Sequence, residues 1–120
     1  MTGIGLITPC GVGTEPTWGA LLEGKSGIGP ITKFDAAKFD SRIAGEVRGF
    51  DPEMFIGKKD VKKMDLFIQY GLGAADEALR QSGWVADTPE KQAVTGTIIG
   101  SGVGGSIGRA SCRERVYACV

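Results

Sequence analysis

The chain has 120 residues, of which 42% are hydrophobic, and its 14 basic and 14 acidic side chains give a formal net charge of zero. This length predicts one domain, and the balanced charge gives no reason to expect nucleic acid or an acidic membrane as a partner. No apolar run could cross a membrane and no signal peptide opens the chain, so a cytoplasmic protein is expected. The sequence contains no His, which excludes a Ser–His or Cys–His pair and a His metal ligand, and we predict neither a metal nor a cofactor.

The first half of the chain predicts short elements that are separated by Gly and Pro. Met1–Thr8 is typical of the end of a strand. Thr14 is predicted to be the N-cap of a helix, which Gly24 ends. A further short strand is expected at Ile43–Val47. Asp51, followed directly by Pro, is a typical start of a helical turn.

The longest predicted element is a helix over Lys58–Gln81, which Gly83 ends. Its apolar residues recur at three- and four-residue steps, and most of its charged residues lie off that stripe. Gly71 and Gly73 each cost this helix about 1 kcal/mol of propensity, which close packing against another backbone would explain. A β-branched run at Ala93–Ile99 predicts a strand. Strands that alternate with helices favour an α/β fold with a mainly parallel sheet.

Two glycine motifs match the patterns of nucleotide-binding loops. Gly19–Ser26 fits G-x-x-x-x-G-K-[ST], which binds phosphate where a strand precedes it and a helix follows. Here the apolar residues around Leu21 make the segment helical, so a helix C-terminus is the favoured interpretation. Gly100–Gly105 contains G-x-G-x-x-G, but Glu114 is the only acidic residue after it, and the alternative is that its glycines let backbone pass close to a ligand or subunit.

A compact basic run at Lys58–Lys63 opens the long predicted helix. One interpretation is a solvated helix start. Lysines at a helix N-terminus oppose the helix dipole, however, at a cost of about a few tenths of a kcal/mol each. Four lysines there indicate an acidic partner, and charge alone leaves the two interpretations open.

The three Cys residues predict neither a disulfide framework nor a nucleophile. Two of them lie in Ser106–Val120, which also holds three Arg and has no apolar period. Cys10 lies between a Pro and a Gly, and the chain offers no base to activate it. We therefore predict that Cys10 is a small buried hydrophobe.

Seven short motifs follow one another in register along the chain. They are T-G-[LIM]-G-x-[LV]-[TS]-P-x-G at Thr2–Gly11, T-W-x-x-L-L-x-G-x-S-G-I at Thr17–Ile28, F-D at Phe34–Asp35, A-G-x-V at Ala44–Val47, F-D-P-E at Phe50–Glu53, K-K-M-D-x-F-x-Q-Y at Lys62–Tyr70 and I-G-S-G-x-G-G at Ile99–Gly105. Through these motifs the chain resembles about the N-terminal quarter of a β-ketoacyl-acyl-carrier-protein synthase of the type II (long-chain) kind. The resemblance also accounts for the chance match to a phosphate loop.

This resemblance implies an α/β fold, namely the incomplete N-terminal half of a thiolase-like layered architecture that forms a homodimer. It also implies a reaction of fatty-acid elongation. An acyl group moves from carrier protein to a Cys nucleophile, and malonyl-carrier protein is decarboxylated with the help of two His. These catalytic residues have no counterpart in this chain, so we expect the full-length parent to be an acyltransferase and this fragment to be inactive.

Two roles carry over from the family by position. Lys59, Lys62 and Lys63 are implied to contact the acidic helix of acyl carrier protein. Val103 is implied to stand where a side chain, often Ile, gates the acyl pocket. The alternatives to this function are a phosphate-loop or dinucleotide-binding module and a non-catalytic fragment that binds an acidic protein.

The end of the chain departs from the family pattern. The peptide I-G-R-A-S-C-R-E-R-V at Ile107–Val116 is what a common short-read sequencing adapter encodes when translated. We therefore expect residues 1–106 to be the partial β-ketoacyl synthase region and residues 107–120 to be an unrelated, artefactual tail. The rival interpretation is a real basic C-terminal helix.

Overall fold

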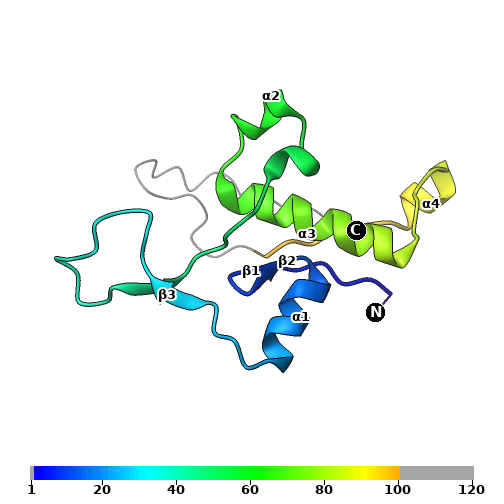
Figure 1. Cartoon of the computed structure of the whole chain (residues 1–120). Coiled ribbons are helices and arrows are strands. Elements are labelled where there is room, and N and C mark those ends of the chain that lie inside the picture. Colours follow the sequence, from blue (N-terminus) through cyan, green and yellow to red (C-terminus); the bar gives the residue numbers. More distant parts are fainter. Residues whose placement is uncertain (1, 101–120) are drawn as a thin grey trace.

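The structure is a computed structural model that describes residues 2–100 (Figure 1). Within this range the strands are β1 (Ile7–Thr8), β2 (Gly11–Val12), β3 (Ile28–Pro30) and β4 (Ile43–Gly45), and the helices are α1 (Thr14–Leu22), the 3-10 helix η1 (Pro52–Met54), α2 (Lys58–Val61), α3 (Leu66–Ser82) and α4 (Pro89–Ala93). The 17-residue α3 is the longest of them, with α2 near its start and α4 near its end (Figure 1). None of the helices in this range has the length and apolar character needed to span a membrane.

The strands form two separate antiparallel pairs. In the first pair, Ile7 of β1 lies opposite Val12 of β2. In the second pair, Gly29 of β3 lies opposite Ala44 of β4. Residues 2–100 therefore contain no parallel pairing, and for this range the prediction of a mainly parallel sheet is wrong. Residues 9–10 form the turn between β1 and β2, and residues 31–42 join β3 to β4. A parallel pair would instead need a crossover connection.

The N-terminal segment crosses α3 at very short range. A side chain on Gly3 would collide with the carbonyl oxygen of Ala78, and one on Gly5 would collide with that of Ala74. Glycine is required at both positions because backbone meets backbone there. The predicted strand over Met1–Thr8 is accordingly short, since β1 alone pairs within the described residues.

Helix α1 begins and ends at glycines. Its N-cap is Gly13, with φ 103°, and not Thr14 as predicted. Thr14 is instead the first helical residue, and its hydroxyl donates to the carbonyl of Ile4 at 3.1 Å. The predicted end at Gly24 is confirmed, because this residue is left-handed at φ 66° and the Lys25 N–H closes the turn on the carbonyl of Ala20 at 2.9 Å.

The long helix predicted over Lys58–Gln81 is interrupted. The chain forms one helical turn, α2, leaves helical geometry before Leu66, and then forms α3 with the extended Asp65 as its N-cap. The side-chain amide of Gln69 donates to carbonyls of the intervening segment, which gives those groups a partner outside the helix. The predicted end at Gly83 is confirmed by its left-handed φ of 66°.

An aromatic cluster packs η1 against α3. The ring of Phe50 stacks on that of Phe55, with 5.9 Å between the ring centres, and meets Tyr70 edge-on, with 4.9 Å between the ring centres. Both arrangements are favourable for aromatic pairs. A Cβ on Gly73 would lie 3.1 Å from the Phe50 ring, so this glycine packs against side chains and not against backbone as predicted. At Gly71 a Cβ would meet nothing within 4 Å, so close packing does not explain that residue.

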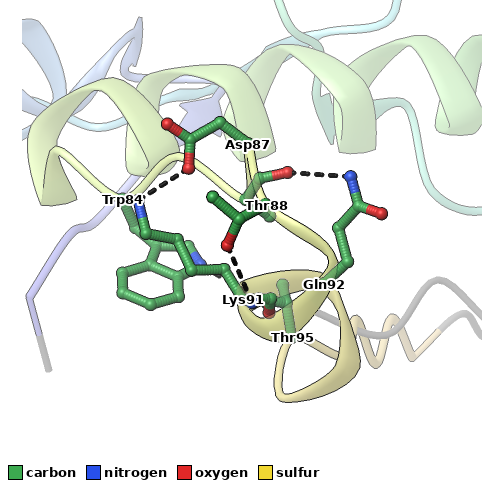
Figure 2. Close-up of polar contacts among 7 residues, drawn as sticks. Trp84, Asp87, Thr88, Lys91, Gln92 and Thr95 are labelled. Atoms are coloured by element: carbon green, nitrogen blue, oxygen red, sulfur yellow. Dashed lines mark hydrogen bonds and ion pairs between the residues drawn. The ribbon is translucent and has the colours of Figure 1, made fainter.

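The strand predicted at Ala93–Ile99 is absent from the described residues. Ala93 ends α4, and residues 95–100 have no regular structure, with the Ile98 side chain 85% exposed. Thr88 begins α4 by accepting a hydrogen bond from the Lys91 N–H at 3.3 Å (Figure 2). The β-branched run has no neighbouring strand in this range with which to pair, so the local helix-start signal decides the structure.

Polar contacts close the loop around α4 (Figure 2). The Lys91 ammonium pairs with Asp87 at 2.7 Å and lies 5.8 Å from the centre of the Trp84 ring. The indole N–H of Trp84 donates to the Thr95 hydroxyl at 3.1 Å. These contacts satisfy the polar groups of the loop locally.

The apolar core of the described residues is thin. Ala36 and Ile56 are the buried hydrophobic residues of this range, whereas Trp18, Leu22 and Met54 are exposed. Burial of apolar surface is the main force that favours folding. Residues 2–100 therefore retain a large apolar surface that is open to further packing.

Candidate docking site

Four exposed lysines gather on and just after α2, at the start of the long helical region. Two of them are paired. The Lys58 ammonium lies 3.3 Å from the Glu53 carboxylate, and the Lys63 ammonium lies 3.1 Å from that of Asp60. The other two, Lys59 and Lys62, form no ion pair with any residue in the range 2–100.

Lys59 and Lys62 lie on the same side of this helical turn. They are three residues apart, and the backbone of Lys62 still has helical geometry at φ −69° and ψ −15°. Side chains at this spacing are neighbours on a helix surface. Two like charges held side by side repel, and an acidic partner relieves that repulsion.

Gln69 of α3 attaches the lysine-bearing segment to α3 through hydrogen bonds. The Gln69 side chain is only 8% exposed, and its amide nitrogen donates to the carbonyls of Val61 at 3.1 Å and Met64 at 2.9 Å. Since these carbonyls lie on either side of Lys62, the lysines are carried by a segment with a fixed attachment to α3.

A shallow, mostly apolar hollow of about 270 Å³ lies elsewhere, between β1, β2, α1, η1 and α3. Glu77 lines it, together with Ile7, Val12, Pro16, Phe55 and Arg80. Both carboxylate oxygens of Glu77 are already occupied, since one accepts the Thr14 N–H at 2.7 Å and the other accepts the Leu6 N–H at 3.0 Å. Burial raises the pKa of Glu77, but these hydrogen bonds outweigh it, so the pKa is below its ordinary value.

Glu46 is a second carboxylate with a structural role. It is buried and accepts hydrogen bonds from the Thr32 hydroxyl at 2.7 Å, the Thr32 N–H at 3.0 Å and the Lys33 N–H at 3.3 Å. These bonds, led by the hydroxyl, lower the pKa of Glu46. Glu46 therefore fixes the loop between β3 and β4 and is not available as a catalytic acid or base.

The nucleotide-loop interpretation fails at Gly19–Ser26. The first four residues of this motif belong to α1, and Gly24 ends the helix. The Lys25 ammonium pairs with Glu23. A phosphate loop needs free N–H groups before a helix, and here the helix comes first.

Cys10 also differs from its prediction. Its side chain is half-buried at the turn between β1 and β2, and its sulfur lies 3.9 Å from the carbonyl oxygen of Lys25. Among the described residues this thiol forms no hydrogen bond with a basic side chain. Within residues 2–100, no group of three or more His, Cys, Asp or Glu side chains could hold a metal ion.

The family of the chain follows from comparison with known proteins. The family model for the beta-ketoacyl synthase N-terminal domain matches residues 1–118. The chain belongs to the β-ketoacyl synthase family. This result confirms the resemblance drawn from the seven motifs and gives no support to a nucleotide-binding module.

Individual members of the β-ketoacyl synthase family are closely similar to this chain. The 3-oxoacyl-[acyl-carrier-protein] synthase 2 of Vibrio cholerae is 50% identical over 105 residues, and that of Coxiella burnetii is 43% identical over 105 residues. Each alignment covers 88% of this chain and 25% of the relative. The chain therefore spans about a quarter of the length of these relatives.

A solved ketosynthase has the same local architecture. The structure titled "The ishigamide ketosynthase/chain length factor" matches with a TM-score of 0.65 and 36% identity, over 72% of this chain and 22% of that one. The predicted fold class, a partial thiolase-like α/β fold, is confirmed by this likeness.

The structure describes three of the four β-ketoacyl synthase site residues predicted from the sequence. Lys59, Lys62 and Lys63 lie together on one exposed segment. Val103 lies outside the described residues. Sequence reasoning missed Gln69 as the support of this segment, although the Q of the K-K-M-D-x-F-x-Q-Y motif was the available signal.

Proposed function

We propose that this chain supplies the carrier-protein docking surface of a 3-oxoacyl-[acyl-carrier-protein] synthase. The whole protein would condense acyl groups with malonyl-acyl carrier protein in fatty-acid elongation. The observation that carries the proposal is the pair of exposed ammonium groups of Lys59 and Lys62, which form no ion pair within residues 2–100. They lie in a chain that is 50% identical to a protein named for this reaction.

The chemistry of the lysine cluster fits an acidic protein partner. An unpaired ammonium loses no existing ion pair when it meets a carboxylate, so Lys59 and Lys62 are the strongest candidates. Lys63 must exchange its contact with Asp60 for a contact with the partner, so we rank it below them. Exposed charge pairs are screened over about 8 Å at physiological salt, so this docking should weaken as salt is added.

The condensing chemistry is assigned to the whole protein and not to these 120 residues. The chain contains no His, and half-buried Cys10 forms no hydrogen bond with a basic side chain in the described range. We therefore propose that the 120-residue chain is catalytically inactive. The homodimer and the cytoplasmic location expected of the whole protein also remain proposals.

Two further assignments rest on the family pattern alone. Val103 is proposed to line the acyl pocket, with a side chain one methylene shorter than the Ile often found there. Residues 107–120 are proposed to be unrelated to the family, after a ketoacyl synthase region at residues 1–106. Sequencing the genomic DNA downstream of Gly105 tests this boundary, and a genomic reading frame that encodes the same tail would overturn it.

Binding of purified acyl carrier protein to the 120-residue chain tests the docking surface. In the Lys59→Glu/Lys62→Glu variant we expect binding to weaken by about tenfold or more, or ~1.4 kcal/mol. The matched control is Lys25→Glu/Lys91→Glu, which makes the same change in net charge at two lysines that are already paired and lie away from α2. Equal Kd values for the double variant and the wild type would overturn the proposal.

A further inference from the structure

Gln69 makes an unusual attachment between two helical segments. It lies in the first turns of α3 and is 8% exposed. Its side-chain nitrogen donates to Val61, the last residue of α2, and to Met64, in the link between the helices. A side-chain amide has two N–H groups, so both can be used on this one short segment.

The segment that Gln69 holds could not keep its shape alone. Helix α2 has four residues, far fewer than an isolated helix needs to be stable in water. The last carbonyls of any helix also lack partners within that helix. The Val61 carbonyl accepts the nearby Met64 N–H at 3.4 Å and also, at the shorter distance of 3.1 Å, the side-chain amide of Gln69, so the end of α2 is tied to α3.

We propose that Gln69 is a positioning residue of the docking site, an inference that rests on the proposed function. Its burial keeps it from contacting a partner protein. It acts through the two carbonyls on either side of Lys62 and thereby fixes where Lys59 and Lys62 stand. A segment that is fixed before binding loses less freedom when it binds, so the same charges bind more tightly.

This positioning role and a purely structural role predict different results. If Gln69 acts through the lysines, its removal weakens binding only while the lysines are present. If Gln69 merely supports the fold, its removal weakens binding by the same factor with or without them. A double-mutant cycle separates the two cases because it measures the coupling between sites.

The test variant is Gln69→Met, which keeps an unbranched side chain of similar length and removes both N–H donors. We expect it to weaken the binding of purified acyl carrier protein to the 120-residue chain about fivefold. In the Lys59→Ala/Lys62→Ala background we expect Gln69→Met to leave Kd unchanged. Amide hydrogen exchange should become faster at Val61 and Met64 in the variant, whereas the second half of α3 should keep its protection.

Gln81→Met is the matched control on the same helix. The side-chain amide oxygen of Gln81 accepts the Ile4 N–H at 2.6 Å, far along α3 from the lysines. We expect this variant to bind carrier protein as the wild type does. Equal weakening by Gln69→Met and Gln81→Met would overturn the positioning role.

The outcomes distinguish this inference from the proposed function. If Lys59→Ala/Lys62→Ala leaves binding unchanged, the proposed function fails. If that double variant weakens binding but Gln69→Met does not, or does so equally in both backgrounds, only the role of Gln69 fails. Should Gln69→Met lose its helical circular dichroism, Gln69→Leu, which is also uncharged and has no N–H donor, replaces it in the cycle. If neither variant folds, Gln69 is a stability residue and the positioning role is overturned.

Discussion

Glu77 of α3 accepts the backbone N–H of Thr14, the first residue of α1, at 2.7 Å across 63 residues of sequence. One helix thus supplies the capping carboxylate of another, where a side chain from the same turn usually serves. The second carboxylate oxygen of Glu77 accepts the backbone N–H of Leu6 at 3.0 Å. A single side chain therefore joins the N-terminal segment, α1 and α3.

Replacing Glu77 by Ala should expose the amides of Thr14 and Leu6 to exchange. Two N–H groups would lose their acceptor, at about 1–3 kcal/mol for each group left without a partner. We expect amide exchange at these two residues to be at least about fivefold faster, since ~1 kcal/mol corresponds to that factor. Gln81→Ala is a suitable control because its acceptor serves Ile4 alone, and unchanged exchange at Thr14 in Glu77→Ala would contradict the prediction.

The contribution of Glu77 should also depend on pH. Its pKa in the folded chain is below the ordinary value of 4.5, so the folded state binds fewer protons than the unfolded state. The stabilisation is therefore fully present above about pH 4.5 and is lost as the pH falls through the lowered pKa. Thr14 exchange protection, corrected for the intrinsic rate, should fall with acid in the wild type but stay flat in Glu77→Gln.

Two glycines should respond in opposite directions to the same substitution. Gly5→Ala places a Cβ against the carbonyl of Ala74, so it should destabilise the chain by at least about 1–3 kcal/mol, as overpacking does. Gly71→Ala meets nothing within 4 Å inside α3 and should raise stability by about 0.5–1 kcal/mol. Amide hydrogen exchange along α3 measures the local stability in both variants, and faster exchange in Gly71→Ala would refute the account.

The elements that sequence predicted well are those whose signals are local. Gly24 and Gly83 both end helices in the left-handed conformation, and Asp51 accepts the Glu53 N–H at 2.9 Å at the predicted helical turn. Each of these depends on residues within a few positions. The family was predicted for the same reason, because short motifs in order are visible without any fold.

The features that sequence did not predict depend on distant residues. The break before Leu66 is bridged by Gln69, and the start of α1 is completed by Glu77. Neither partner can be identified from hydrophobic periodicity, because that pattern places a residue on one face of a helix but does not show which distant residue it contacts. The same limit applies to the lysines, since their spacing predicted a cluster but not which two lack a carboxylate partner within residues 2–100.

Removing Asp60 should strengthen docking. Asp60 lies among the four lysines, and its carboxylate pairs with the Lys63 ammonium at 3.1 Å. Asp60→Asn therefore removes a negative charge and frees one ammonium group. We expect acyl carrier protein to bind about 1.4- to fivefold more tightly, in line with ~0.2–1 kcal/mol for an exposed pair. The effect should shrink as salt rises.

The control for Asp60→Asn is Asp87→Asn. Asp87 pairs with Lys91 at 2.7 Å next to α4, so this variant makes the same change in net charge away from the lysine cluster. We expect no change in Kd from it. An equal gain in the two variants would mean that net charge alone, and not the position of Asp60, controls binding.

The 120-residue chain should unfold gradually and not in one sharp transition. Among residues 2–100 only Ala36 and Ile56 are buried hydrophobic residues, and cooperative folding requires apolar burial that offsets about 1–2 kcal/mol of backbone entropy per ordered residue. Thermal melts followed by far-UV and near-UV circular dichroism should be broad and should not coincide. Elongation with the remainder of a full-length relative should sharpen the melt, because exposed residues such as Trp18 and Ile98 would gain partners. A single steep transition with strong near-UV dichroism in the 120-residue chain would contradict this prediction.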